Sequence, residues 1–147
     1  MRFYIASSWK NQTAVELLTM ELRSMGHEVL SFVENIHGHQ KGCQAMDGKN
    51  PIPFEEWVYS ERGTKTFKFD LDSATGADCV IYLGPSGTDA WAEIGAAWAS
   101  KVPVIGIWSK NEPAGLARRM VQVWFYDVHE LLDYVSNMKK DENAVHQ

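Results

Sequence analysis

The sequence predicts an α/β fold: a single domain with a doubly wound, five-stranded parallel sheet of the flavodoxin-like or Rossmann-like kind. Short apolar runs typical of buried strands alternate with segments whose apolar residues recur at helical spacing. Strands that alternate with helices are joined by right-handed crossovers, which produce parallel sheets. The chain has 147 residues, of which 45% are hydrophobic and 22% charged, so residues 1–147 have the size and composition of one globular domain.

The first strand and helix have clear sequence signals. Residues 3–6 form an apolar run that predicts a short buried strand. Thr13 and Glu16 fit a capping box at the start of a helix, and Gly26 is a typical helix end. Residues 28–33 predict the second strand. The apolar face of the helix consists of Val15, Leu18, Leu22 and Met25.

Residues 34–68 show no sustained periodicity and predict a long connection. Glycine, proline and histidine are frequent in its first part, and residues 54–59 are expected to form a short helix within it. Connections of this length in compact domains are usually functional or mobile. Periodicity returns with a short helical segment at residues 70–76, which ends in a glycine.

The second half of the chain repeats the alternation of strands and helices. The expected elements are a strand at 78–83, a glycine-rich turn at 84–89, a helix at 90–100, a strand at 102–108, a helix at 113–120, a strand at 121–125 and a final helix from residue 127. The tail, residues 139–147, is polar and is expected to fray.

Composition excludes several functional classes. The net charge of -5 provides no basic field for nucleic acid, so we expect no nucleic-acid partner. No apolar stretch reaches membrane-spanning length and no leader precedes the first strand, so we expect a soluble cytoplasmic protein without a membrane partner. Cys43 and Cys79 suggest no disulfide framework, and the spacing of Cys43 with His37 and His39 matches no familiar metal site. We therefore expect no metal and no cofactor.

Ligands of doubly wound folds bind outside the carboxyl ends of the strands. This rule selects the loops at residues 7–11, 86–89 and 109–112. The turn at 84–89 leads into a helix N-terminus, where backbone N–H groups favour anions and polar ligand atoms. It matches neither a Walker loop nor a dinucleotide fingerprint. Glu93 follows in the first turns of the helix, either as a reactive group or as a solvated charge near a favourable dipole.

Four features, in order along the chain, resemble a known family. They are the opening strand and small-residue loop Phe3-Tyr4-Ile5-Ala6-Ser7-Ser8, Asp70 followed eight residues later by Asp78, Glu93-Ile94-Gly95 after a glycine-rich turn, and the strand entry Lys101-Val102-Pro103-Val104. On these features the chain resembles the nucleoside 2-deoxyribosyltransferase-like superfamily, which includes the deoxynucleoside 5'-monophosphate N-glycosidases. The resemblance spans nearly the whole chain except residues 34–68.

The resemblance implies catalytic roles for three residues. Glu93 matches the glutamate that attacks the anomeric carbon of the sugar, as in retaining glycosidases. Tyr4 would orient Glu93, and Asp70 would bind a sugar hydroxyl or handle the proton of the base. The plainer interpretations are a core aromatic for Tyr4 and a helix cap for Asp70. The expected substrate-binding residues are Ser7, Ser8, Trp9, Ser86, Gly87, Thr88 and Asp89.

We therefore expect an enzyme that cleaves or transfers the N-glycosidic bond of a (deoxy)nucleoside or nucleoside 5'-monophosphate. The acceptor stays open, because Gly87 stands where transferases of the family tend to carry an acidic residue. Two alternatives remain: a TIR-like NAD glycohydrolase and a non-catalytic nucleotide-binding sensor. The hydroxyls of the turn favour tolerance of a 5'-phosphate, which Asp89 opposes by its like charge. Arg118 and Arg119 would reach a phosphate or form a solvated face.

Aromatic and small residues suggest further contacts. Trp9 and Trp91 flank the predicted site and would stack on a base. Ile94, Ala97 and Trp98 suggest a dimer seam on one helix, and related enzymes are homo-oligomers, so we expect self-association.

Overall fold

Five parallel strands form one sheet in the order β2-β1-β3-β4-β5, which confirms the predicted fold class. The computed structural model describes residues 1–35, 53–113 and 115–145. The strands are β1 (Arg2–Ser7), β2 (Glu28–Leu30), β3 (Cys79–Leu83), β4 (Val104–Ile107) and β5 (Val123–Phe125). The helices are α1 (Gln12–Ser24), α2 (Phe54–Val58), α3 (Glu61–Gly76), α4 (Thr88–Ala99) and α5 (Val128–Val145), with 3₁₀ turns η1 (Trp9–Asn11), η2 (Phe32–Glu34) and η4 (Leu116–Met120).

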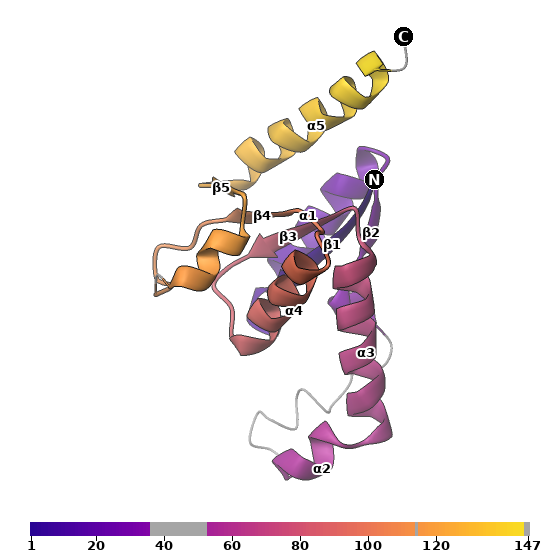
Figure 1. The fold of residues 1–147 in the computed structure, drawn as a ribbon, viewed down its shortest axis with the longest axis vertical. Helices are drawn as coiled ribbons and strands as arrows, with labels where there is room; N and C mark the ends of the chain where they lie inside the picture. Colours follow the sequence, from indigo (N-terminus) through magenta and orange to yellow (C-terminus); the bar gives the residue numbers. More distant parts are fainter. Residues whose placement is uncertain (36–52, 114, 146–147) are drawn as a thin grey trace.

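The sheet separates two apolar layers, because successive side chains of a strand point to opposite faces. Phe3 and Ile5 of β1 pack with α1 and α5 on one face. Tyr4 and Ala6 point to the other face, where they pack with α3 and α4. Figure 1 shows α3 and α4 side by side over this second face. Tyr4 is therefore directed toward the helix that carries Glu93.

Helix α1 begins and ends close to its predicted bounds, but the capping box is wrong. The helix starts at Gln12, with Asn11 as an N-cap that makes no side-chain capping hydrogen bond. The Glu16 carboxylate instead accepts a hydrogen bond from the Gln12 side chain at 3.0 Å. Gly26 follows the helix with φ of 84°, a left-handed conformation that glycine adopts without strain, which confirms it as the helix end.

Helix α3 is much longer than the predicted segment. Residues 61–68, expected to belong to the connection, form its first half, so the irregular region is shorter than 34–68. The Ser60 hydroxyl caps the helix by accepting a hydrogen bond from the Gly63 amide at 2.9 Å. Residues 31–33, expected to continue a strand, instead leave the sheet and enter η2. Most of the expected helix at 113–120 is η4, and α5 continues through residues 139–145, where fraying was expected.

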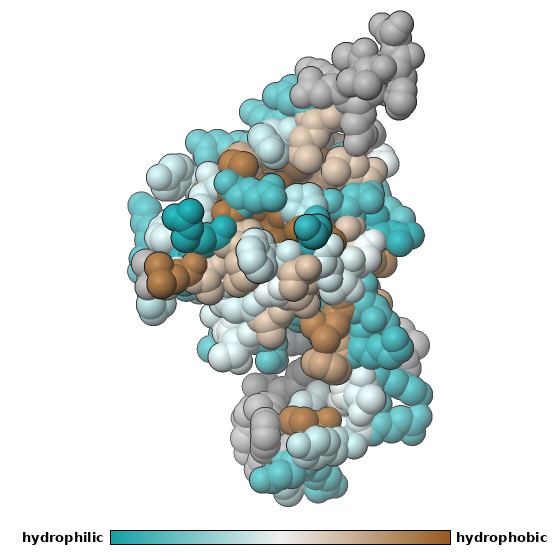
Figure 2. Space-filling model, viewed as in Figure 1, coloured by the Kyte–Doolittle hydropathy of each residue, from teal (hydrophilic) through white to brown (hydrophobic). Residues whose placement is uncertain are grey.

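The small residues of α4 serve the core of this chain. Ile94 and Ala97 are fully buried against the sheet, so they cannot form the expected dimer seam. Trp98 alone of that set is exposed, at 59% of its surface. The face drawn in Figure 2 shows its hydrophobic residues in separate patches among polar ones. Self-association stays a prediction, and its surface would differ from the one expected.

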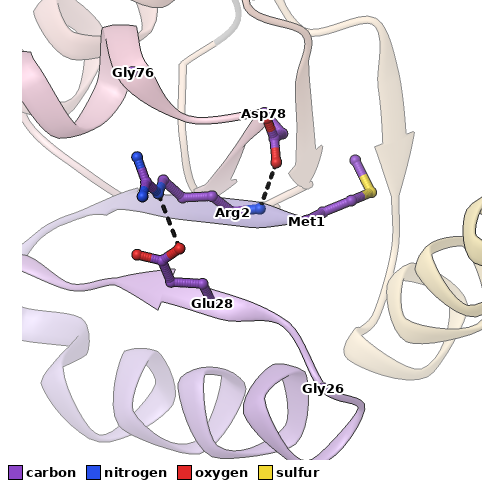
Figure 3. Close-up of a pocket in the computed structure, with 6 residues that line it drawn as sticks. All are labelled: Met1, Arg2, Gly26, Glu28, Gly76 and Asp78. Atoms are coloured by element: carbon purple, nitrogen blue, oxygen red, sulfur yellow. Dashed lines mark hydrogen bonds and ion pairs between the residues drawn. The ribbon is translucent and has the colours of Figure 1, made fainter.

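The amino edge of the sheet carries a hollow lined by charged groups (Figure 3). Arg2 forms an ion pair with Glu28 at 3.1 Å, and its backbone N–H donates to Asp78 at 2.7 Å. Through this hydrogen bond, Asp78 holds the start of β1 next to the start of β3. This hollow lies at the end of the strands opposite to their carboxyl ends, where ligands of such folds bind. Among the described helices, none has the length and apolarity needed to span a membrane.

Candidate active site

A cavity of about 250 Å³ opens at the carboxyl edge of the sheet, beside the ends of β1 and β3. These strands run in register to Ser7 and Leu83, so the loops that follow them are neighbours. In the sheet, β2 lies on one side of β1 and β3 lies on its other side. The order in which strands are added therefore reverses direction between β1 and β3, which makes this the switch point of the sheet. The cavity is lined by Ser7, Ser8, Trp9, Phe32, Asp70, Gly87, Thr88, Asp89, Ala90 and Glu93.

Glu93 is a buried carboxylate held by the sheet. Its side chain projects from α4 into the cavity, and the residue is 7% exposed. The hydroxyl of Tyr4, a fully buried residue of β1, donates a hydrogen bond to Glu93 Oε2 at 3.1 Å. The neighbouring Ala90, Ile94 and Ala97 pack in the core and fix this part of α4 against the sheet. Glu93 is therefore positioned both by its helix and by the central strand.

Asp70 reaches the same cavity from α3. One of its carboxylate oxygens, Oδ1, is buried without a hydrogen-bond partner in the described part of the chain. Buried polar atoms are nearly always satisfied in native proteins, by protein groups, water or ligands. An orphan oxygen that lines a cavity therefore indicates a position for a ligand donor.

Burial and neighbouring negative charges raise the proton affinity of both carboxyl groups. Burial raises the pKa of Glu93 to about 8, and the charges of Asp70 and Asp89 add to this effect, whereas the Tyr4 hydrogen bond lowers it. Burial likewise raises the pKa of Asp70 to about 7, with a contribution from Asp89 and an opposing one from Tyr4. The pKa of Tyr4 lies well above its usual value because of burial and the two carboxylates, so its hydroxyl stays a donor.

This arrangement can hold a nucleophile and an acid in one site. Between pH 7 and 8 the two carboxyl groups together hold about one proton. One group is then an ionised carboxylate and the other a proton donor, which is the division of labour that enzymes obtain by shifting carboxyl pKa values apart.

The loop after β1 is fixed by hydrogen bonds that the sequence did not indicate. The Ser7 hydroxyl donates to the carbonyl of Leu83 at 2.6 Å, and the Asn11 amide donates to the Ser7 hydroxyl at 3.0 Å. Asn11 also donates to the carbonyl of Pro85 at 2.8 Å, which joins the loops after β1 and β3. The sequence offered one indication of this role for Asn11, namely that it is a polar residue in a loop expected at the carboxyl edge of the sheet.

Phe32 is a second residue that sequence analysis missed. It lines the cavity and packs edge-on against Trp9, with ring centroids 5.3 Å apart. Its position two residues after β2 would have placed it at the carboxyl edge if that strand had been predicted to end at Leu30. These two rings form an apolar wall suited to the flat face of a base.

Three residues expected near the ligand lie elsewhere. Ser86 does not line the cavity, and its hydroxyl donates to the hydroxyl of Tyr82 at 3.0 Å. Trp91 packs on Tyr82, with ring centroids 4.7 Å apart. Arg118, expected to reach a phosphate or face solvent, forms an ion pair with Glu112 at 3.1 Å and its side chain is only 14% exposed. The other expected site residues lie where the sequence analysis placed them. Tyr4 reaches the cavity through its hydrogen bond to Glu93. The remaining ones line the cavity: Ser7, Ser8, Trp9, Asp70, Gly87, Thr88, Asp89 and Glu93.

The described residues include no group of three or more His, Cys, Asp or Glu side chains arranged to hold a metal ion. His37, His39 and Cys43 lie outside the described residues, so the sequence-based expectation for them stays a prediction. The chemistry available in the cavity is that of carboxyl groups, hydroxyls and backbone amides.

No protein-family model and no curated protein matches this chain. Solved structures do match. The chain is similar to a 2-deoxyribosyltransferase from the psychrotolerant bacterium Bacillus psychrosaccharolyticus, with a TM-score of 0.68 and 22% identity over 91% of this chain and 92% of that one. It is also similar to a CMP N-glycosidase from Clostridium botulinum, with a TM-score of 0.55 and 17% identity over 92% of this chain and 98% of that one. The chain therefore has the nucleoside deoxyribosyltransferase fold, in agreement with the resemblance in its sequence motifs.

Proposed function

We propose that this chain cleaves or transfers the N-glycosidic bond of a (deoxy)nucleoside, with Glu93 as the nucleophile. The observation that carries the proposal is the buried Glu93 carboxylate, hydrogen-bonded by Tyr4 at 3.1 Å and facing a cavity at the switch point of the sheet. The fold shared with a deoxyribosyltransferase and an N-glycosidase supports it.

In the first half of the reaction, ionised Glu93 attacks the anomeric carbon of the sugar while Asp70 holds the shared proton. Because the pKa of Glu93, about 8, lies above that of Asp70, about 7, this reacting state is the minor form of the singly protonated pair. Tyr4 binds Oε2, which leaves Oε1 to form the new C–O bond. The N-glycosidic bond breaks and its electron pair moves to the base, which takes a proton from the carboxylic acid of Asp70. The products of this half are a free base and a glycosyl ester of Glu93.

In the second half, an acceptor attacks the same carbon and releases the Glu93 carboxylate. Asp70, now ionised, takes the proton from the acceptor as it attacks. Water as acceptor gives hydrolysis, and the ring nitrogen of a second base gives transfer.

The small cavity of about 250 Å³ suits one nucleoside better than a dinucleotide, which favours this reaction over cleavage of NAD.

Product analysis tests the proposed function. We expect purified protein incubated with 2'-deoxynucleosides to release free base, measured by liquid chromatography. A second base in the mixture distinguishes the two acceptors, because a new nucleoside appears only in transfer. Ligand binding without product would contradict the proposal in favour of a sensor, and nicotinamide released from NAD would favour a TIR-like activity.

The charge of the cavity favours a nucleoside over its 5'-monophosphate. Three of the lining residues, Asp70, Asp89 and Glu93, carry carboxyl groups, and none of the lining residues among those described is basic. The Ser86 hydroxyl, which sequence analysis assigned to the ligand, is directed to Tyr82. A phosphate dianion would therefore approach like charges without a balancing cation. This revises the tolerance of a 5'-phosphate that the turn residues suggested.

We expect kcat/KM for a deoxynucleoside to exceed that for its 5'-monophosphate by about tenfold, or roughly 1.4 kcal/mol. The measurement is initial base release from the matched pair of substrates. Asp89→Asn should narrow the difference, because it removes the carboxylate of the turn. Preference for the monophosphate, selectively lost in Ser86→Ala, would show that the turn binds phosphate after all.

A further inference from the structure

A second buried polar cluster lies beside the cavity and is not part of its lining. Its centre is Glu112, in the loop after β4. Glu112 Oε1 accepts hydrogen bonds from the Tyr82 hydroxyl, by a very short contact, and from Trp91 Nε1 at 3.1 Å. The same oxygen forms the ion pair with Arg118 Nη2 at 3.1 Å. One carboxylate oxygen therefore joins residues from β3, α4 and η4.

The cluster is shielded from solvent. The Arg118 and Glu112 side chains are 14% and 7% exposed, so each charge depends on the other for compensation. The Arg118 guanidinium also lies over the Trp91 ring, 4.9 Å from its centroid. Removal of one partner leaves a poorly solvated charge on the other. The geometry of these groups is thus held more firmly than that of an exposed ion pair.

The cluster connects to the cavity through the segment between β3 and α4. Ser86, in that segment, donates to the Tyr82 hydroxyl, which in turn donates to Glu112. Gly84 packs so closely on the cluster that a Cβ there would lie 2.6 Å from Glu112 Oε2. Trp91 ties the first turns of α4 to the same carboxylate. Residues 87–90, which lie between these attachments, all belong to the lining of the cavity.

We propose that Glu112 is a positioning residue, which acts through Tyr82 and Trp91 to hold residues 84–91 against the cavity. Its expected effect on catalysis rests on the proposed function, because residues 87–89 would bind the nucleoside. Glu93 is held separately, by Tyr4 and by the core packing of Ile94. Loss of the cluster therefore weakens substrate binding more than it impairs chemistry.

Hydrogen exchange tests the positioning role without any substrate. The amides of residues 92–94 bond to the carbonyls of residues 88–90 in the helical pattern, so they report opening of the first turn of α4. We expect Tyr82→Phe and Glu112→Gln each to speed their exchange about tenfold, with less than a twofold change in β1 and α1. Glu28→Gln removes a carboxylate from an ion pair at the opposite edge of the sheet (Figure 3) and should leave these amides unchanged. Unchanged exchange, or faster exchange throughout the chain, would overturn the proposal.

Kinetics provide the second test. Tyr82→Phe should raise KM for the nucleoside about tenfold and change kcat less than threefold. The matched control is Val135→Ala, which truncates a fully buried residue of α5 on the other face of the sheet and lowers stability without touching the cluster. A fall in kcat at constant KM, or the same kinetic change in Val135→Ala, would overturn the proposal. If the wild type turns over no nucleoside, the proposed function fails, and the exchange experiment alone decides the role of Glu112.

Discussion

Glu93→Gln is expected to lower kcat for glycosidic cleavage by at least about 10⁴-fold, because an amide cannot form the covalent ester. Glutamine keeps the size of the side chain and an oxygen that can accept the Tyr4 hydrogen bond. Circular dichroism should therefore show an intact fold, and Glu93→Ala should lose activity equally. Undiminished turnover in Glu93→Ala would refute the mechanism. Failure of both variants to fold would show that Glu93 serves the structure.

The same substitution should stabilise the protein at alkaline pH. The pKa of Glu93 is raised from 4.5 to about 8 in the folded chain, so ionisation opposes folding. Wild-type stability is fully present below pH 4.5 and is lost as pH rises toward 8, whereas Glu93→Gln has no such loss. We expect a melting temperature at pH 9 that is roughly 5 °C or more above that of the wild type. The difference should vanish near pH 4, and a constant difference would contradict the burial of an ionisable Glu93.

Asp70→Asn is expected to lower kcat by about 10²- to 10⁴-fold, the usual contribution of a general acid–base. An amide can hydrogen-bond the base but cannot donate a proton to it or take one from the acceptor. Substrates with bases that leave readily as anions should lose less activity than ordinary nucleosides. An equal loss for both kinds of substrate would assign Asp70 to sugar binding, which is the other role that the resemblance implies.

The pH profile separates the two carboxyl groups. In the wild type, kcat/KM should be bell-shaped with limits near pH 7 and 8. Below the lower limit both groups are protonated and no nucleophile exists, and above the upper limit both are ionised and no acid remains. Asp70→Asn removes a negative charge that raises the pKa of Glu93, so the acid limb of the variant, which reports the ionisation of Glu93 alone, should lie below pH 8. The Asp70→Asn variant should also lose the alkaline limb of the profile. If the limb were retained, it would have to arise from the ionisation of another group.

Sequence patterns predicted the strands and the edge that carries the site because both depend on local regularities. Apolar runs indicated the buried strands, and alternation along β1 is what directs Tyr4 toward α4. The meeting of Tyr4, Asp70 and Glu93 followed from the resemblance rather than from spacing, since these residues come from three separate elements. These three residues meet only because the parallel sheet places their elements side by side. The predicted alternation of strands and helices implied such a sheet.

The first half of α3 was missed for a different reason. Gly63, Thr64 and Thr66 are poor helix formers, so local propensity argued against a helix. The Ser60 cap and two ion pairs at i,i+4 spacing, Lys65–Glu61 and Lys68–Asp72, are weak signals that point the other way. Packing of the distal half of α3 on the sheet, with Ala74 fully buried, extends the helix through this unfavourable stretch.

The Glu112 cluster could not be predicted from any local pattern. Glu112 and Arg118 are charged residues in an apparently polar region, and such residues are usually exposed. Their burial depends on Tyr82 and Trp91, which are distant in sequence and meet them only in the folded sheet. The rule that selects loops at the carboxyl edge did include Glu112, but it could not distinguish a residue facing the cavity from one that supports it.

The short outer strands of the sheet have a consequence for behaviour at high concentration. Both edges, β2 and β5, consist of only three residues, whereas the inner strands are longer. An exposed strand edge presents unpaired backbone groups that can recruit another chain and seed aggregation, and short edges limit this danger. The edges of the sheet therefore offer little backbone for the addition of another strand, which favours contacts between copies of the chain through side chains of the helices and loops.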